Sequence, residues 1–242
     1  MAESLLAVER VSHRFGGLLA VNAASLSAPE GRITGLIGPN GAGKTTLFAI
    51  ISGFLKPSEG AIRYGGKDIT GEPPHRLARL GIARTFQIVQ AFAGLSVRDN
   101  ILVGAYLRHP SRAEALTAAE RVGHDVGLGE MLGRPADTLT VAGRKRLELA
   151  RALATGPKLL LLDEVMAGLR PTEVDQLVAV FRRINGETGL TILLIEHVMR
   201  AVMALAREIH VLHHGELIAS GAPEEIVRHP AVLACYLGAG PP

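Results

Sequence analysis

The segment from Gly38 to Thr45 constrains the fold of this chain more than any other. Its sequence, Gly-Pro-Asn-Gly-Ala-Gly-Lys-Thr, matches the pattern G-x-x-x-x-G-K-[ST] without a mismatch. The apolar run from Ile33 to Ile37 predicts a buried strand before it, and a helix is expected from Lys44 to about Gly53. A strand that runs through a glycine-rich turn into a helix predicts an α/β fold with a phosphate-binding loop.

The residue types in this loop suit the phosphates of a nucleotide. Glycines let successive backbone N–H groups point into one concavity, and the following helix adds the positive end of its dipole. We expect Lys44 to reach the β- and γ-phosphates, Thr45 to ligate Mg²⁺ and Thr46 to reach a phosphate oxygen. A glycine-rich turn with a surface lysine is disfavoured in this strand–loop–helix setting. The predicted ligands are therefore the phosphates of a nucleotide, with ATP as the nucleotide implied by the family resemblance described below, and Mg²⁺. The predicted loop consists of Gly38, Pro39, Asn40, Gly41, Ala42, Gly43, Lys44, Thr45 and Thr46.

A second motif is an apolar strand that ends in two carboxylates. Leu159 to Leu162 is followed directly by Asp163 and Glu164, at the strand end where α/β sheets place ligands. We predict that Asp163 belongs to the Mg²⁺ shell and that Glu164 orients and deprotonates the attacking water. The alternative is that both acids only begin a helix, where acids are favoured. The complete phosphate loop upstream makes that the minority interpretation.

The rest of the chain predicts one α/β unit with a helical insertion. Leu5 to Val11 and Val21 to Leu26 alternate apolar and polar residues on either side of Gly16-Gly17, which predicts antiparallel strands. From about Ser96 to Ala154 helical spacing replaces the strand signals, and strands and helices alternate again after it. We expect a single domain, 1–242, with a mainly parallel sheet covered on both faces. Its predicted parts are a core and β lobe, 1–88 and 155–242, and a helical lobe, 89–154.

Composition narrows the classes of function. The net charge of +3 is too small and too scattered to indicate nucleic acid as a partner. The single cysteine, Cys235, allows no intramolecular disulfide and suits a reducing compartment. No apolar run approaches the roughly 20 residues that span a bilayer, and we expect no secretory signal.

Three further features resemble, in their order along the chain, the pattern of the ABC ATPases. Ile82 to Gln87 is a strand that ends in a glutamine, Leu147 to Leu153 is a helix before the acid-ended strand, and Ile192 to His197 is a strand that ends in a histidine. The resemblance covers nearly the whole chain. It implies a P-loop NTPase (RecA-like) core with an antiparallel β subdomain and an inserted α-helical lobe.

The same resemblance implies roles for individual residues. Gln87 would contact the metal and the water, and His197 would contact the γ-phosphate. Phe15 would stack on adenine, although a place in the core is an equal alternative for this side chain. The implied catalytic set is Glu164, His197 and Gln87, and the implied metal set is Thr45, Gln87 and Asp163.

The signature segment of that family is altered in this sequence. Its usual form is Leu-Ser-Gly-Gly-Gln, and here it reads Leu139-Thr140-Val141-Ala142-Gly143. In an ABC dimer this segment caps the ATP of the opposite subunit, so Thr140, Ala142 and Gly143 are candidate nucleotide contacts. Thr140 keeps a hydroxyl at the helix start, whereas the side chains of Val141 and Ala142 hinder a close approach. Arg144 and Lys145 face either an acid or phosphate, or only solvent.

A narrower resemblance points to the branched-chain amino-acid importer ATPases. It rests on Asp68 to Gly71, Pro73 to Arg76, Leu80 to Gln87 and the tail from Pro230 to Gly238. It implies a subunit that hydrolyses ATP to power solute import, peripheral to the cytoplasmic face of the inner or plasma membrane. The implied partners are transmembrane permease subunits, a second ATPase subunit of the same or another type, and indirectly a solute-binding protein.

Three alternatives are weighed against this function. An exporter ATPase for lipid or lipopolysaccharide shares every chemical motif. A non-transport ABC ATPase acting on DNA or ribosomes is less favoured, because this chain has one cassette and a compact insertion. A P-loop GTPase or kinase is disfavoured, because the sequence has no Asn-Lys-x-Asp motif.

The predicted docking site for the membrane partner is the segment that begins at Gln87 and continues from Ile88 to Gly94. It is apolar for an exposed loop, as a docking surface should be. The alternative is that Phe92 and Leu95 pack inside the helical lobe.

Overall fold

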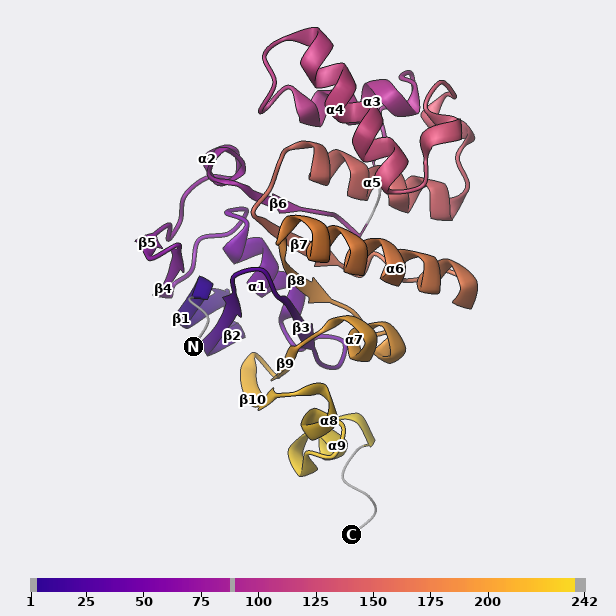
Figure 1. Ribbon diagram of the computed structural model, residues 1–242. Coiled ribbons are helices and arrows are strands. Elements are labelled where there is room, and N and C mark those ends of the chain that lie inside the picture. The colour runs from indigo at the N-terminus through magenta and orange to yellow at the C-terminus, as the bar shows by residue number, and fades with distance from the viewer. Residues whose placement is uncertain (1–3, 88–89, 238–242) are drawn as a thin grey trace.

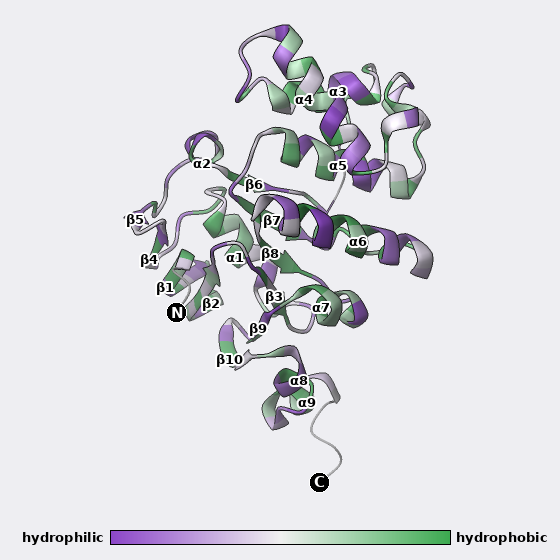
Figure 2. Cartoon of the chain, viewed as in Figure 1, coloured by the Kyte–Doolittle hydropathy of each residue, from purple (hydrophilic) through white to green (hydrophobic). Residues whose placement is uncertain are grey.

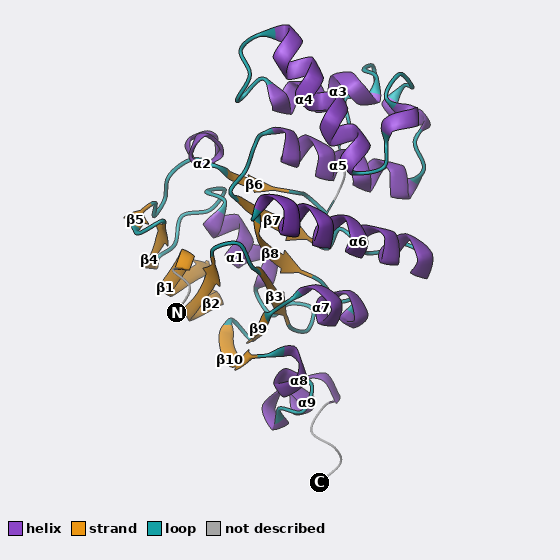
Figure 3. Cartoon of the chain, viewed as in Figure 1, coloured by secondary structure: helices purple, strands orange, loops and turns teal. Residues whose placement is uncertain are grey.

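The computed structural model describes residues 4–87 and 90–237, and its elements are drawn in Figures 1 and 3. The strands are β1 (Ser4–Phe15), β2 (Leu18–Pro29), β3 (Ile33–Ile37), β4 (Glu59–Tyr64), β5 (Lys67–Asp68), β6 (Ile82–Arg84), β7 (Leu159–Asp163), β8 (Thr191–Ile195), β9 (Glu208–His213) and β10 (Glu216–Gly221). The helices are α1 (Lys44–Ile51), α2 (Pro74–Leu80), α3 (Val97–Ala105), α4 (Arg112–Asp125), α5 (Val141–Ala154), α6 (Pro171–Thr188), α7 (Met199–Leu205), α8 (Pro223–Ile226) and α9 (Pro230–Leu237), with short 3-10 turns at Gly129–Met131 and Ala136–Thr138.

The strands form two sheets. The first has the order β2-β1-β4-β5, and β1 and β2 pair antiparallel around the turn at Gly16 and Gly17, as predicted. The second has the order β10-β9-β3-β8-β7-β6, in which every neighbouring pair is parallel except β10 with β9. The predicted mainly parallel sheet is therefore confirmed. In such a sheet β3 and β7 end at the same edge, which brings the phosphate loop and the two acids together.

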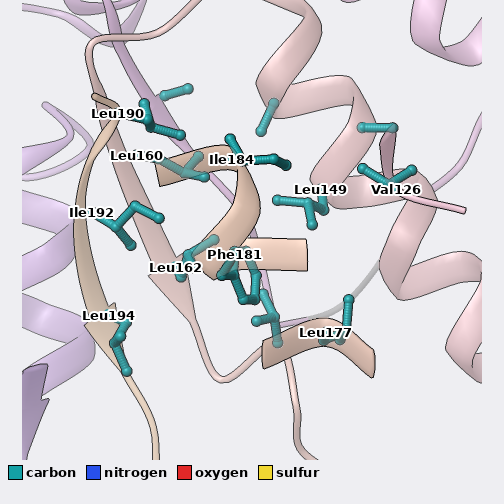
Figure 4. Close-up of a cluster of buried hydrophobic side chains, with 14 of the residues drawn as sticks. Val126, Leu149, Leu160, Leu162, Leu177, Phe181, Ile184, Leu190, Ile192 and Leu194 are labelled. Atoms are coloured by element: carbon teal, nitrogen blue, oxygen red, sulfur yellow. The ribbon is translucent and has the colours of Figure 1, made fainter. Parts of the chain in front are cut away.

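Alternate side chains of β7 and β8 enter two different hydrophobic clusters. The cluster on one face packs against α6, and Figure 4 shows Leu160, Leu162, Ile192 and Leu194 beside Leu177, Phe181 and Ile184. The cluster on the other face includes residues of α1 and of the antiparallel sheet, and β7 and β8 contribute Leu159, Leu161, Leu193 and Ile195 to it. Helix α6 is amphipathic, and green and purple alternate along it in Figure 2. The end of β7 is thus held from both sides, which fixes Asp163 in place.

Helices α3, α4 and α5 lie in the chain between β6 and β7. They pack on one another through small and aliphatic side chains, among them Ile101, Ala119 and Leu147, and Figure 1 shows them gathered at one end of the molecule. Helices α8 and α9 lie at the opposite end of the view. Within residues 4–87 and 90–237 no helix combines the length and apolarity that a membrane span requires.

Candidate nucleotide site

Two glycines of the phosphate loop occupy positions that no other residue fits. Gly38 has φ 151° and Gly43 has φ 101°. A Cβ atom at Gly38 would lie 2.0 Å from the carbonyl oxygen of Leu212, and one at Gly43 would lie 2.3 Å from that of Ala20. These approaches are closer than any side chain tolerates, because the opposing atoms belong to the backbone. The loop therefore depends on glycine for its packing against β2 and β9 as well as for its turn.

Lys44 is held inside the loop by the backbone. Its Nζ donates hydrogen bonds to the carbonyl oxygens of Gly38 at 2.8 Å and Pro39 at 2.9 Å, and the side chain is buried. Burial lowers the pKa of Lys44 below its usual value, and the charges of Glu164 and Asp163 oppose that shift. The amine is thus already directed into the loop concavity, beside the two acids at the end of β7.

A cavity of about 360 Å³ opens along the phosphate loop. Its lining includes the predicted loop residues from Asn40 to Thr46, together with Phe15 and Glu164. Gly38 and Pro39 act instead through their carbonyl groups, which hold Lys44. The side chain of Phe15 is 49% exposed, so the alternative place in the core is wrong. Sequence reasoning missed four other lining residues, Leu18, Leu19, Ala20 and His214. The available sequence signal was the leucine pair directly after the Gly16-Gly17 turn.

The three predicted catalytic residues meet at one carboxylate oxygen. The Nε2 of Gln87 donates a hydrogen bond of 2.9 Å to Oε2 of Glu164, and Nδ1 of His197 lies 3.9 Å from the same atom. These residues follow β6, β7 and β8, three neighbouring strands of the parallel sheet. The geometry leaves a carboxylate beside the phosphate cavity, steadied by an amide and flanked by an imidazole.

The backbone of Glu164 adopts a left-handed conformation, with φ 50°. Such a conformation is uncommon outside glycine and persists where neighbouring groups enforce it. The N–H of Glu164 donates to the carbonyl oxygen of Ile195 at 2.9 Å, and its own carbonyl accepts from Nζ of Lys145 at 3.2 Å. Burial lowers the pKa of Lys145, and the charges of Glu196 and Glu164 oppose that shift. For Arg144 and Lys145 the sequence allowed either an acid or phosphate, or only solvent, as the surroundings. Lys145 is half-buried near Glu164 and Glu196. Nε of Arg144 donates to the carbonyl oxygen of Leu139.

The three predicted metal residues line one further cavity. It measures about 530 Å³, and Thr45, Gln87 and Asp163 all face it. Hydroxyl, amide and carboxylate oxygens are ligands that Mg²⁺ accepts, so the residues present fit this ion. One partner of Asp163 was not predicted. Nη2 of Arg84 lies 2.8 Å from Oδ2 of Asp163, and both side chains are nearly inaccessible to solvent.

The altered signature segment begins helix α5. Thr140 is the N-cap, and its Oγ1 accepts a hydrogen bond of 3.2 Å from the N–H of Gly143. Val141 is 57% exposed, whereas Gly143 is buried. A Cβ atom at Gly143 would lie 3.2 Å from Cβ of Leu139, so a larger residue there requires a small shift of its neighbours. Neither Thr140, Ala142 nor Gly143 lines the two cavities beside the phosphate loop. The structure therefore does not bring them to the site with the other candidates.

This combination of fold and site defines a class of protein. The family model of the ABC transporters matches residues 21–167, and the model described as a branched-chain amino acid ATP-binding cassette transporter matches residues 216–241. The chain belongs to the ABC transporter family. Its core is that of a P-loop NTPase, it binds nucleotide, and it is an ATP-hydrolysing cassette.

Its relatives extend over nearly the full chain. The high-affinity branched-chain amino acid transport ATP-binding protein BraF of Pseudomonas aeruginosa is 41% identical, over 98% of this chain and 99% of its own length. The corresponding protein LivG of Escherichia coli K12 is 40% identical with the same coverage. A solved ATP-binding cassette of an ABC transporter in its ADP conformation matches with a TM-score of 0.88 and 30% identity, over 98% of this chain and 100% of its own. The interpretation as an importer ATPase is thereby favoured over the exporter and non-transport alternatives.

Proposed function

We propose that this chain is the ATPase subunit of an importer for branched-chain or related amino acids, peripheral to the cytoplasmic face of the membrane. The observation that carries the enzymatic part is the meeting of Gln87 and His197 at the carboxylate of Glu164, beside the phosphate loop. The transported solute is supported by the names of the relatives and by the match at residues 216–241.

In the nucleotide site, the loop from Gly38 to Thr46 holds the phosphates. Lys44 exchanges its bonds to the loop carbonyls for bonds to phosphate oxygens, because the amine is already aimed at that concavity. Phe15 stacks on the adenine ring at the outer end of the cavity, where its half-exposed face gains burial.

Mg²⁺ belongs to the same site, and Thr45, Gln87 and Asp163 are the residues that hold it. When bound, the ion neutralises charge that develops on the phosphates. Asp163 supplies a carboxylate fixed by its buried strand. Gln87 links these metal residues to the catalytic carboxylate, because its amide donates a hydrogen bond to Glu164.

Glu164 is the general base for water attack. Its carboxylate faces the phosphate cavity and accepts the amide of Gln87, which orients the side chain. The side chain of His197 is more exposed than that of Glu164, which suits contact with the γ-phosphate at the open side of the site. Positioning and charge, rather than covalent chemistry, are what phosphoryl transfer requires.

A second ATPase subunit completes the site. Thr140, Ala142 and Gly143 do not line this chain's own cavities, and Val141 projects from the start of α5. We infer that this segment meets the nucleotide of the opposing subunit, through the Thr140 hydroxyl and the helix N-terminus. The opposing subunit is either a second copy or a different ATPase.

The permease partner docks in the groove between the predicted helical lobe, 89–154, and the remainder of the chain. Two adjoining cavities of about 270 and 530 Å³ share Arg84, Phe86, Glu148 and Arg151. Phe92 lines the larger of the two cavities, is 45% exposed and has the guanidinium of Arg151 over its ring, so it does not pack inside the helical lobe. Ile88 and Val89 of the predicted docking segment lie outside the described residues. A solute-binding protein acts only through the permeases.

The proposal is tested by transport in a reconstituted system. The chain is combined in proteoliposomes with the permeases and any second ATPase encoded beside it, and uptake of labelled leucine, isoleucine and valine is measured with internal ATP. We expect uptake that requires the solute-binding protein and disappears with Lys44→Ala. Uptake that is absent with a complete complex, or hydrolysis stimulated by a lipid in place of an amino acid, would contradict the importer function.

A further inference from the structure

Arg84 and Asp163 form a buried ion pair at the inner wall of the proposed metal site. Nη2 of Arg84 lies 2.8 Å from Oδ2 of Asp163, with side-chain exposures of only 9% and 3%. The two residues are 79 positions apart and come from β6 and β7, which are neighbours in the sheet. A charge-assisted hydrogen bond of this length, shielded from solvent, is a stronger interaction than an ion pair on the surface.

The guanidinium of Arg84 is itself held on several sides. Its Nη1 donates to Oγ of Ser52 at 3.0 Å. Its carbon lies 5.9 Å from the ring centres of Phe48 and Phe54 and 5.3 Å from that of Phe86, within the range of cation–π attraction. A planar group with two anchored nitrogens and three surrounding rings has little freedom to move.

We propose that Arg84 is a positioning residue for the divalent cation. By binding Oδ2 it fixes the rotation of the Asp163 carboxylate, so that Oδ1 is the oxygen left for the ion in the cavity shared with Thr45 and Gln87. This inference rests on the proposed function, because the orientation of Asp163 matters to a cation only where the nucleotide site binds one.

Two effects of Arg84 on the cation oppose each other. Its positive charge repels the ion, and its hydrogen bond preorganises the ligand. The second effect dominates, because Asp163 is buried and its carboxylate, without the bond to Arg84, is free to rotate toward other donors. Partners that orient a metal ligand typically contribute about 10–100-fold to metal affinity. We therefore expect the loss of Arg84 to lower the affinity for the cation by about tenfold or more.

The test measures cation binding without turnover. Mn²⁺ replaces Mg²⁺, since it takes the same oxygen ligands, and its free concentration is read by electron paramagnetic resonance with the protein in excess over ADP. Arg84→Met is compared with the parent chain and with Arg98→Met. Arg98 also pairs with a carboxylate, Glu120 at 3.3 Å, but neither residue lines the two cavities of the site. We expect weaker Mn²⁺ binding in Arg84→Met, unchanged ADP binding in the absence of the ion, and parent values for Arg98→Met.

A second variant covers the case in which Arg84→Met does not fold. Arg84→Lys keeps the charge but replaces the two separate nitrogens that bind Ser52 and Asp163 by one, on a shorter side chain, so its Mn²⁺ affinity should fall between those of parent and Arg84→Met. Mn²⁺ affinity equal to or above that of the parent in folded Arg84 variants overturns the inference. A parent chain that binds ADP with no response to Mn²⁺ overturns the proposed metal site itself, which separates the two failures.

Discussion

Replacement of Glu164 by glutamine tests the proposed chemistry most directly. The new amide keeps the shape of the side chain and can still accept from Nε2 of Gln87, which lies 2.9 Å from Oε2 in the parent. It cannot take a proton from water. General-base removal costs about 10²–10⁴-fold in rate, which is about 3–5 kcal/mol in the barrier.

The expected change in stability is much smaller. The bond from Gln87 passes from a charged to a neutral acceptor, which costs about 1 kcal/mol and lowers Tm by about 2–4 °C in a domain of this size. Because Lys44 and Thr45 are unchanged, ATP affinity should persist. Bound ATP should then hold two subunits together.

Phosphate release, ATP binding and ATP-dependent dimerisation are measured on Glu164→Gln, His197→Ala and the parent. The expected pattern is binding without turnover in Glu164→Gln. A Glu164→Gln protein that hydrolyses at nearly the parent rate, beside an inactive His197→Ala, would show that the assigned roles are wrong.

Three further outcomes are expected. Lys44→Ala should abolish productive ATP–Mg²⁺ binding, because it removes the cation that the loop carbonyls aim at the phosphates; parent affinity by titration calorimetry would contradict the assignment. Phe92→Asp should reduce co-purification with the permeases at unchanged Tm, whereas Leu233→Asp, an equally exposed control on α9, should not; a loss of folding alone would refute docking at Phe92. Combined Ala142→Gly and Gly143→Gln should raise the basal ATPase rate of the assembled transporter several-fold if closer approach outweighs the contact at Leu139. An unchanged or lower rate would show that the native signature is already competent.

The phosphate loop and the strand before it could be predicted because the residues that determine them are adjacent in the chain. The strand Ile33–Ile37 and the start of α1 at Lys44 were predicted at the observed positions, since a buried strand, glycines and a helix follow one another without interruption. Helix α2 and strand β10 were not predicted. Helix α2 has only seven residues, and β10 is an edge strand whose Glu-Leu-Ile-Ala-Ser-Gly sequence carries no clear alternation.

The contacts within the site could not be predicted in the same way. The pairing of Arg84 with Asp163 and that of Gln87 with Glu164 join residues that lie far apart in the chain. They depend on the order β8-β7-β6 in the sheet, which no single segment encodes. The left-handed backbone at Glu164 was also unpredictable, because glutamate has no preference for it.

The left-handed backbone of Glu164 lowers stability at the same residue whose side chain is proposed for catalysis. Glycine at position 164 would relieve about 1–2 kcal/mol of conformational cost, and asparagine or aspartate would relieve part of it. Each of these replacements removes or shortens the carboxylate proposed as the general base. A library of variants selected only for heat resistance should therefore enrich inactive proteins at this position, because the backbone hydrogen bonds to Ile195 and Lys145 are available to any residue there.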